Sequence, residues 1–217
     1  MSAETLCWRA TRFGFMLLGN EFALDARQHF VEQHTATRKS VMWVRTGDHS
    51  LMAGNPARLE DYVTLLVNHE YSYLMRDGGV IQIAYTFERD RIERHRLAYY
   101  PCPFPITTRD INSYDTDAFM SNVEENLLLK SPIRFDYVPS QAADYHPASH
   151  LTVNDPSCRI PARAPLHFDT FMKFILENFY FEASQNETVA RELAFGQEED
   201  CLSDHDRRRV YLQWTHQ

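Results

Sequence analysis

The sequence predicts an α+β fold in which helices pack on one face of a mostly antiparallel sheet. Apolar and polar residues alternate over residues 81–87 and again over 92–100, with Arg89-Asp90-Arg91 between them, which is typical of a β-hairpin. Residues 58–74 and 167–180 instead carry apolar side chains at helical spacing. Consecutive hairpins with helices at either end are typical of an α+β fold with helices on one sheet face.

The amino-terminal part is expected to contain helices, one strand and a loop. Over residues 4–34 apolar residues recur at three- and four-residue spacing, and Gly19-Asn20 predicts a break between two helices. Residues 40–45 are rich in strand formers, and Gly47 to Pro56 supply turn residues. The helix over 58–74 has a one-sided apolar stripe and should end before Asp77-Gly78-Gly79.

The second half continues the pattern of short strands and amphipathic helices. Proline cannot donate to a sheet ladder, so Pro101, Pro103 and Pro105 should terminate the hairpin. The further elements that the pattern predicts are a short helix over 119–129, a strand over 133–137, a hairpin from 149–153 and 158–160, a helix over 167–180 and a last strand over 209–214. The apolar stripe of the helix over 167–180 should enter the core with Phe168, Phe171, Met172, Ile175, Leu176 and Phe179.

Composition favours one cytoplasmic domain. The 217 residues contain no Gly/Ser-rich or Pro-rich linker, so residues 1–217 are interpreted as a single domain. The 44% of hydrophobic residues, including 14 Phe and 11 Tyr, suffice for one core. Four widely separated cysteines without a C-x-x-C pair indicate reduced thiols. No apolar run approaches the roughly 20 residues of a membrane-spanning helix, so no membrane partner is expected.

The net charge of −8 disfavours indiscriminate binding to nucleic acids, so such binding would need a local basic face. A protein partner is therefore the first expectation, and nucleic acid is the second.

Several segments resemble a bacterial family known only as a domain of unknown function. The resemblance rests on His95-Arg96-Leu97, Arg134-Phe135-Asp136-Tyr137, Ser149-His150-Leu151 and Arg159-Ile160-Pro161, and it extends over about residues 40–180. It implies no activity. Members of the family look like bacterial accessory genes, which implies a setting in defence or toxin-antitoxin systems. The first and last 35 residues lie outside the resemblance.

Strand alternation predicts a polar sheet face opposite the core. If Ile83, Leu97 and Phe135 face the core, the residues that point the other way are Gln82, Thr86, Arg94, Arg96, Arg134, Asp136, His150 and Thr152. Arginine supplies planar donors for carboxylate or phosphate, and histidine exchanges protons near neutral pH. The alternative is an ordinary solvated face with weak Arg–Asp pairs. His95 has the opposite parity and is interpreted as a structural core histidine.

Other chemistry has weaker support in the sequence. His146 and His150 have the spacing of a helical metal pair, but Pro147 lies between them, and no metal or cofactor is predicted. The chain lacks P-loop, dinucleotide-binding and nucleophile-elbow motifs. Cys102 and Cys158 have no activating motif for a cysteine hydrolase.

Two functions therefore remain open. The first is an interaction or regulatory component that binds a partner through the polar sheet face. The second is a metal-independent nuclease in which His150 acts as general acid or base, and Arg96, Arg134 and Arg159 stabilise the transition state.

Overall fold

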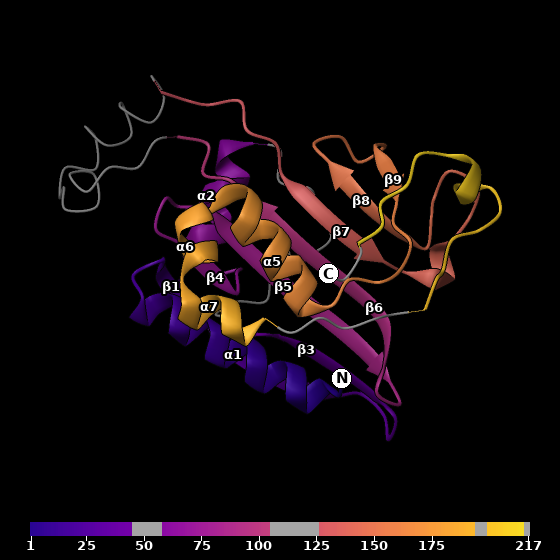
Figure 1. The fold of residues 1–217 in the computed structure, drawn as a ribbon, viewed down its shortest axis with the longest axis horizontal. Coiled ribbons are helices and arrows are strands. Elements are labelled where there is room, and N and C mark those ends of the chain that lie inside the picture. The colour runs from indigo at the N-terminus through magenta and orange to yellow at the C-terminus, as the bar shows by residue number, and fades with distance from the viewer. Residues whose placement is uncertain (45–57, 105–125, 194–198, 215–217) are drawn as a thin grey trace.

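The computed structural model describes residues 1–44, 58–104, 126–193 and 199–214, and it confirms the α+β fold (Figure 1). Nine strands of this described part form one sheet in the order β1-β4-β5-β6-β7-β8-β9, and β3 pairs with both β2 and β5. All strand pairings in the sheet are antiparallel. The strands are β1 Ala23–Ala26, β2 His29–Gln33, β3 Arg38–Trp43, β4 Tyr73–Met75, β5 Val80–Glu88, β6 Arg91–Tyr100, β7 Ile133–Tyr137, β8 Ser149–Val153 and β9 Arg159–Pro161. The helices are α1 Ala3–Gly19, α2 Leu59–Val67, α5 Phe168–Phe179, α6 Phe181–Gln185 and α7 Glu187–Glu192, with short 3-10 turns η2 Pro139–Gln141 and η3 Asp206–Arg208.

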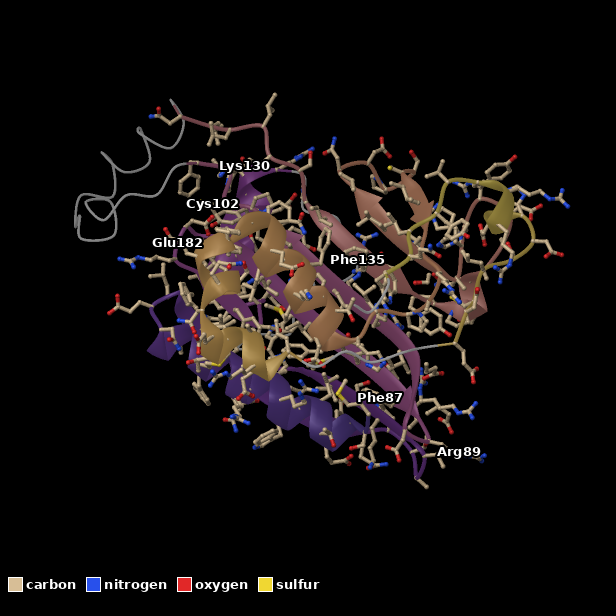
Figure 2. The ribbon with its side chains drawn as sticks, viewed as in Figure 1. Phe87, Arg89, Cys102, Lys130, Phe135 and Glu182 are labelled. Carbon is tan, nitrogen blue, oxygen red and sulfur yellow. The ribbon has the colours of Figure 1, made fainter. Side chains whose placement is uncertain are left out.

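The predicted central hairpin is confirmed as β5 and β6. Arg89 and Asp90 connect the strands with φ of 48° and 63°, the left-handed conformation that suits a two-residue hairpin turn. Arg89 lies at the tip of the hairpin, beyond Phe87 (Figure 2). The hairpin of β8 and β9 is also confirmed.

The main core lies on the sheet face predicted to be apolar. Ile83 pairs with Leu97, Leu97 with Phe135, and Phe135 with Leu151, so these four side chains form one row across β5 to β8. Helices α1, α5, α6 and α7 supply the other side of this core, and α5 to α7 lie in front of the sheet in Figure 1. The row and its helical cover make one contiguous core.

Helix α5 confirms the predicted amphipathic stripe over most of its length. Phe168, Phe171 and Ile175 are buried, and the Phe171 ring packs edge-on to Phe135 at 6.2 Å between centroids. Phe179, which was expected in the core, is 42% exposed because it is the last residue of the helix. Its ring still lies 4.7 Å from that of Tyr99.

A second, smaller core lies on the opposite sheet face. Tyr62 and Leu65 of α2 pack there with Val80, Ala98 and Tyr100. Val80 and Ala98 share the parity of the predicted polar face, so α2 is the helix that covers this other side. One end of the sheet is therefore sandwiched between two layers.

Two predicted helices are wrong in part. After α1, Glu21 takes φ of 60° and reverses the chain, and the predicted second helix is replaced by β1 and β2. The backbone of β1 pairs with the distant β4, and β2 pairs with the strand that follows it, β3; these pairings override the local helical spacing. Similarly, α2 ends at Val67, and residues 73–75 form β4 because they pair with β5.

Two other predicted elements, one helix and one strand, were not found as predicted. The predicted helix over 119–129 lies largely outside the described residues, and residues 126–129 are not helical. The predicted strand over 209–214 is reduced to a single bridge between Leu212 and Ala162. No helix in the described part of the chain has the length and apolarity needed to cross a membrane.

Candidate functional site

Strands β6 to β9 bring the predicted site residues to one sheet face. Asp136 of β7 lies opposite Arg96 of β6 and opposite His150 of β8. The neighbouring row of the same face contains Ala98, Arg134, Thr152 and Arg159. Alternation along each strand and the register between strands therefore place all four predicted residues on the side away from the main core.

The carboxylate of Asp136 lies at the centre of the site. The Nε of Arg96 donates to Oδ1 of Asp136 at 3.1 Å, and the Nε of Arg134 donates to Oδ2 at 2.5 Å. Nε2 of His150 lies 3.9 Å from the same Oδ2. We call Arg96, Arg134, Asp136 and His150 the polar cluster. Because two cations share one anion, the two arginines and Asp136 leave one net positive charge in an acidic protein.

The polar face is less exposed than a solvated sheet face would be. Asp136, His150, Thr152 and Gln82 are buried, whereas Arg94 is exposed. The side chains of Arg96 and Arg134 keep 18% and 11% exposure, compared with 4% for His150. The arginines are therefore the members of the polar cluster that reach the surface most.

Burial and charge act in opposite directions on Asp136. Desolvation raises the pKa of its carboxyl group, but the guanidinium groups of Arg134 and Arg96 outweigh this effect and bring the pKa below its ordinary value. Asp136 is accordingly ionised at neutral pH, and the two ion pairs are intact there.

His150 is held as a neutral imidazole. Burial has the largest effect and lowers its pKa, whereas the hydrogen bond to Pro147 and the charge of Asp136 raise it less. His146 and Arg159 make smaller contributions that also lower the pKa. Nδ1 donates to the carbonyl oxygen of Pro147 at 2.9 Å, which leaves Nε2 as the unprotonated nitrogen. The lone pair of Nε2 makes His150 a proton acceptor, although the side chain is largely covered.

Two polar atoms of the same face are buried without a hydrogen-bond partner in the described structure. They are Oγ1 of Thr152 and Oε1 of Gln82, and both residues lie in the row that contains Arg134. Buried polar atoms in folded proteins are nearly always satisfied, so unpaired ones indicate a place that water or a ligand completes.

Some residues of the site were missed or left unassigned in the sequence interpretation. Asp136 was placed on the polar face without a role, although its i, i+2 spacing from Arg134 already placed both side chains on one side of β7. His146 was considered only as a metal ligand, yet its ring packs against His150 at 5.2 Å between centroids. Tyr100 lies near enough for Arg96 and Arg134 to influence its pKa, which burial raises to about 12.

His95 is a core residue, as predicted. It is buried, and its Nε2 accepts a hydrogen bond from the backbone N–H of Leu166 at 2.9 Å. Among the described residues, no three His, Cys, Asp or Glu side chains group as a metal site. The four cysteines are free thiols, and Cys102 is buried.

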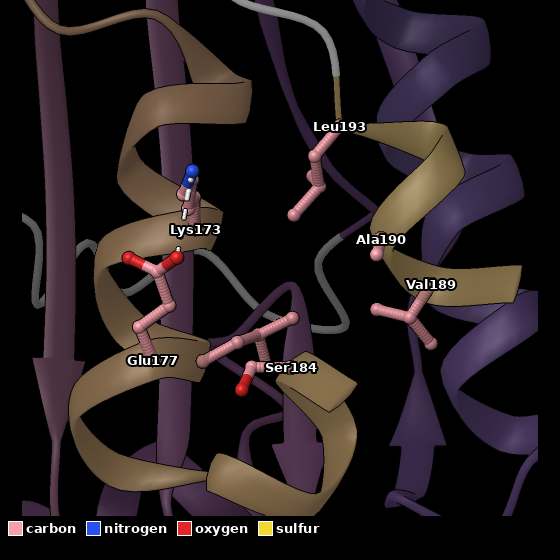
Figure 3. Close-up of a pocket in the computed structure, with 7 residues that line it drawn as sticks. Lys173, Glu177, Ser184, Val189, Ala190 and Leu193 are labelled. Atoms are coloured by element: carbon pink, nitrogen blue, oxygen red, sulfur yellow. Dashed lines mark ion pairs between the residues drawn. The ribbon is translucent and has the colours of Figure 1, made fainter. Parts of the chain in front are cut away.

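Two of the cavities formed by described residues lie away from the polar cluster. The smaller, about 130 Å³, is lined by residues of α5, α6 and α7 (Figure 3). Its apolar wall includes Leu176, Val189 and Leu193, and the Lys173–Glu177 ion pair stands at one side. The larger, about 420 Å³, lies beside α2 and Tyr100 on the opposite sheet face.

Comparison with known proteins identifies the family. The model of an uncharacterised conserved protein family, DUF2290, matches residues 24–214. The chain belongs to this family. The DUF2290 match starts earlier and ends later than the resemblance over 40–180, so it includes β1 and the carboxy-terminal segment. Neither the curated proteins nor the solved structures contain a significant match to the chain.

Proposed function

We propose that the protein is a non-enzymatic interaction component that binds an acidic group of a protein partner through Arg96, Arg134 and Arg159. The observation that carries the proposal is the sharing of Asp136 by Arg96 and Arg134. A fixed guanidinium pair loses little conformational entropy on binding, and it presents planar donors suited to a carboxylate. Arg159 adds a third cation in the row of Arg134.

The charge of the protein favours a protein partner over nucleic acid. With a net charge of −8, the whole molecule repels a continuous phosphate backbone, whereas a single acidic side chain can be received locally. The setting that we propose is a cytoplasmic bacterial accessory system of the defence or toxin-antitoxin type. Free thiols and the family resemblance support this setting.

The test compares partner capture by matched arginine variants. Tagged wild type, Arg96→Gln, Arg134→Gln and the control Arg38→Gln are recovered from host cells, and co-purifying proteins are quantified by mass spectrometry. Arg38 forms an exposed ion pair with Glu93 away from the polar cluster. We expect a partner that wild type and Arg38→Gln retain and that both cluster variants lose by at least about tenfold, since an interfacial charge pair contributes roughly 2–5 kcal/mol. Equal recovery by all four proteins contradicts the proposal.

A metal-independent nuclease is the second candidate, favoured by the position of His150 between Pro147 and Asp136. In this function neutral His150 removes a proton from the attacking hydroxyl, and the arginines neutralise the developing phosphorane charge. The burial of the His150 side chain argues against this second candidate, because a general base must reach the substrate. Purified protein is incubated with mixed RNA and single-stranded DNA in EDTA. Cleavage by wild type that falls about 10²–10⁴-fold in His150→Gln supports the nuclease, and no cleavage by wild type eliminates it.

A further inference from the structure

We infer that the larger cavity is a binding site for a small organic anion with an apolar body. The cavity lies between α2, the end of β6 and residues 127–132, and its volume of about 420 Å³ is in the range of roughly 300–1,000 Å³ typical of ligand sites. The cavity of about 130 Å³ under α5 is below that range. This site is distinct from the polar cluster, so the protein would bind a small ligand in addition to the proposed protein partner.

The walls of the cavity are apolar on two sides. Tyr62 and Leu65 come from α2, and Tyr100, Pro101 and Pro103 come from the end of β6 and the chain that follows it. All of these except the partly exposed prolines belong to the second core, which keeps this wall in place. Tyr62 is fixed further, because its hydroxyl donates to the carbonyl oxygen of Gly78 at 2.6 Å.

The facing wall exposes three consecutive leucines. Leu127, Leu128 and Leu129 line the cavity and are all exposed to solvent. The N–H of Leu128 donates to the carbonyl oxygen of Pro103 at 2.6 Å, which ties this segment to the opposite wall. Exposed apolar side chains beside a cavity favour a ligand with an apolar body, because its binding removes apolar surface from water.

The charge of the lining selects an anion. Arg58 and Lys130 are the charged residues that line the cavity, and no acidic residue lines it within the described part of the chain. This is unusual in a protein with 30 acidic residues. Neither Arg58 nor Lys130 forms an ion pair with another described residue, so both cations can pair with a ligand carboxylate, sulfonate or phosphate.

The test uses 1-anilinonaphthalene-8-sulfonate as the probe, since it combines a sulfonate with an apolar aromatic body. Fluorescence titration of the full chain should show saturable binding of one probe per protein. The double variant Arg58→Gln/Lys130→Gln should bind at least about tenfold more weakly, because a hydrogen bond to a charged group contributes enough for such a change. Arg89→Gln is the matched control, since Arg89 is an exposed cation at the far end of the sheet from Lys130 (Figure 2), and it should bind like wild type.

A second variant and a competitor pair locate the site. Ser131→Trp adds a large side chain to the lining and should also weaken binding, and unchanged melting temperatures show that the variants are folded. Decanoate should displace the probe, and decanol at the same concentration should displace much less. Absence of saturable binding, equal affinity of wild type and the double variant, or equal displacement by decanoate and decanol would overturn the inference. Because the polar cluster is intact in all these variants, failure here is separate from failure of the partner-capture test.

Discussion

At the scale of residues, one buried carboxylate organises the site. Asp136 accepts from two guanidinium groups, and the low pKa of its carboxyl group follows from these cations in spite of burial. Without the carboxylate, Arg96 and Arg134 would bring two like charges together in a largely buried position. The arrangement therefore stabilises the fold as well as the orientation of both arginines.

We expect Asp136→Asn to lower the free energy of unfolding by about 3 kcal/mol. Removing one partner of a buried ion pair leaves uncompensated charge, which typically costs about 3–5 kcal/mol. Urea unfolding at pH 7 measures the change. Asp155→Asn is the control, since Asp155 is exposed and its carboxylate accepts hydrogen bonds from the nearby Ser157. Equal unfolding midpoints for Asp136→Asn and Asp155→Asn would contradict the role given to Asp136.

At the scale of elements, the contact between α1 and the sheet depends on one glycine. Helix α1 starts at an N-cap in which Ser2 accepts from the N–H of Thr5, and it buries Leu6, Ala10, Phe13 and Leu17 on one side. Gly14 is on this buried side. A Cβ atom there would lie 2.7 Å from the buried Tyr73 ring and 2.9 Å from the Cβ of Ala26.

Gly14→Ala should destabilise the protein by about 1–3 kcal/mol, the usual cost of overpacking a core. The higher helix propensity of alanine, about 1 kcal/mol, offsets part of this cost. Gly19→Ala provides the opposite expectation in the same helix, since a Cβ at Gly19 meets nothing within 4 Å. This variant should be neutral or stabilised by up to about 1 kcal/mol. Thermal unfolding of both variants decides the matter, and the same shift for both would refute the packing argument.

At the scale of the whole molecule, helices cover one face of the sheet and one end of the other face, and buried histidines lie in different parts of the sheet. Burial lowers the pKa of His29 to about 3 and of His95 to about 4. Nε2 of His29 is hydrogen-bonded to the hydroxyl of Ser72, and His95 accepts from the N–H of Leu166. Both rings are therefore neutral in the folded protein at neutral and mildly acidic pH.

This burial predicts a loss of stability in mild acid. Above the unfolded-state pKa of about 6.5 both states hold neutral histidines, so the stability is complete there. As pH falls from about 6.5 toward 4, these histidines bind protons in the unfolded chain but not in the folded protein. Each histidine therefore lowers the free energy of unfolding by about 1 kcal/mol per pH unit. Urea unfolding at pH 7, 6 and 5 measures the slope. His95→Gln keeps an acceptor for Leu166 and should reduce the slope, whereas equal stability of wild type at pH 7 and 5 would contradict the prediction.

The sequence by itself determined the elements with a strong local pattern. Alternation over 80–100, 133–137 and 149–153 specified β5 to β8, and it placed Arg96, Arg134 and His150 on the side opposite Ile83, Leu97 and Phe135. The stripe of α5 was equally clear in the sequence. These predictions held because the side-chain period of a strand or helix is set by its own backbone geometry.

Only the tertiary structure decided which segments pair with one another and which side chains are buried. Residues 23–26 and 73–75 became strands that pair with each other although they lie far apart in the chain, and no local spacing encodes that partner. The order and register of the strands decided that Asp136 lies between Arg96 and His150. Burial of the polar face likewise depends on elements packed together from separate parts of the chain. Periodicity gives the direction of a side chain, whereas its partners and exposure follow from long-range pairing and packing.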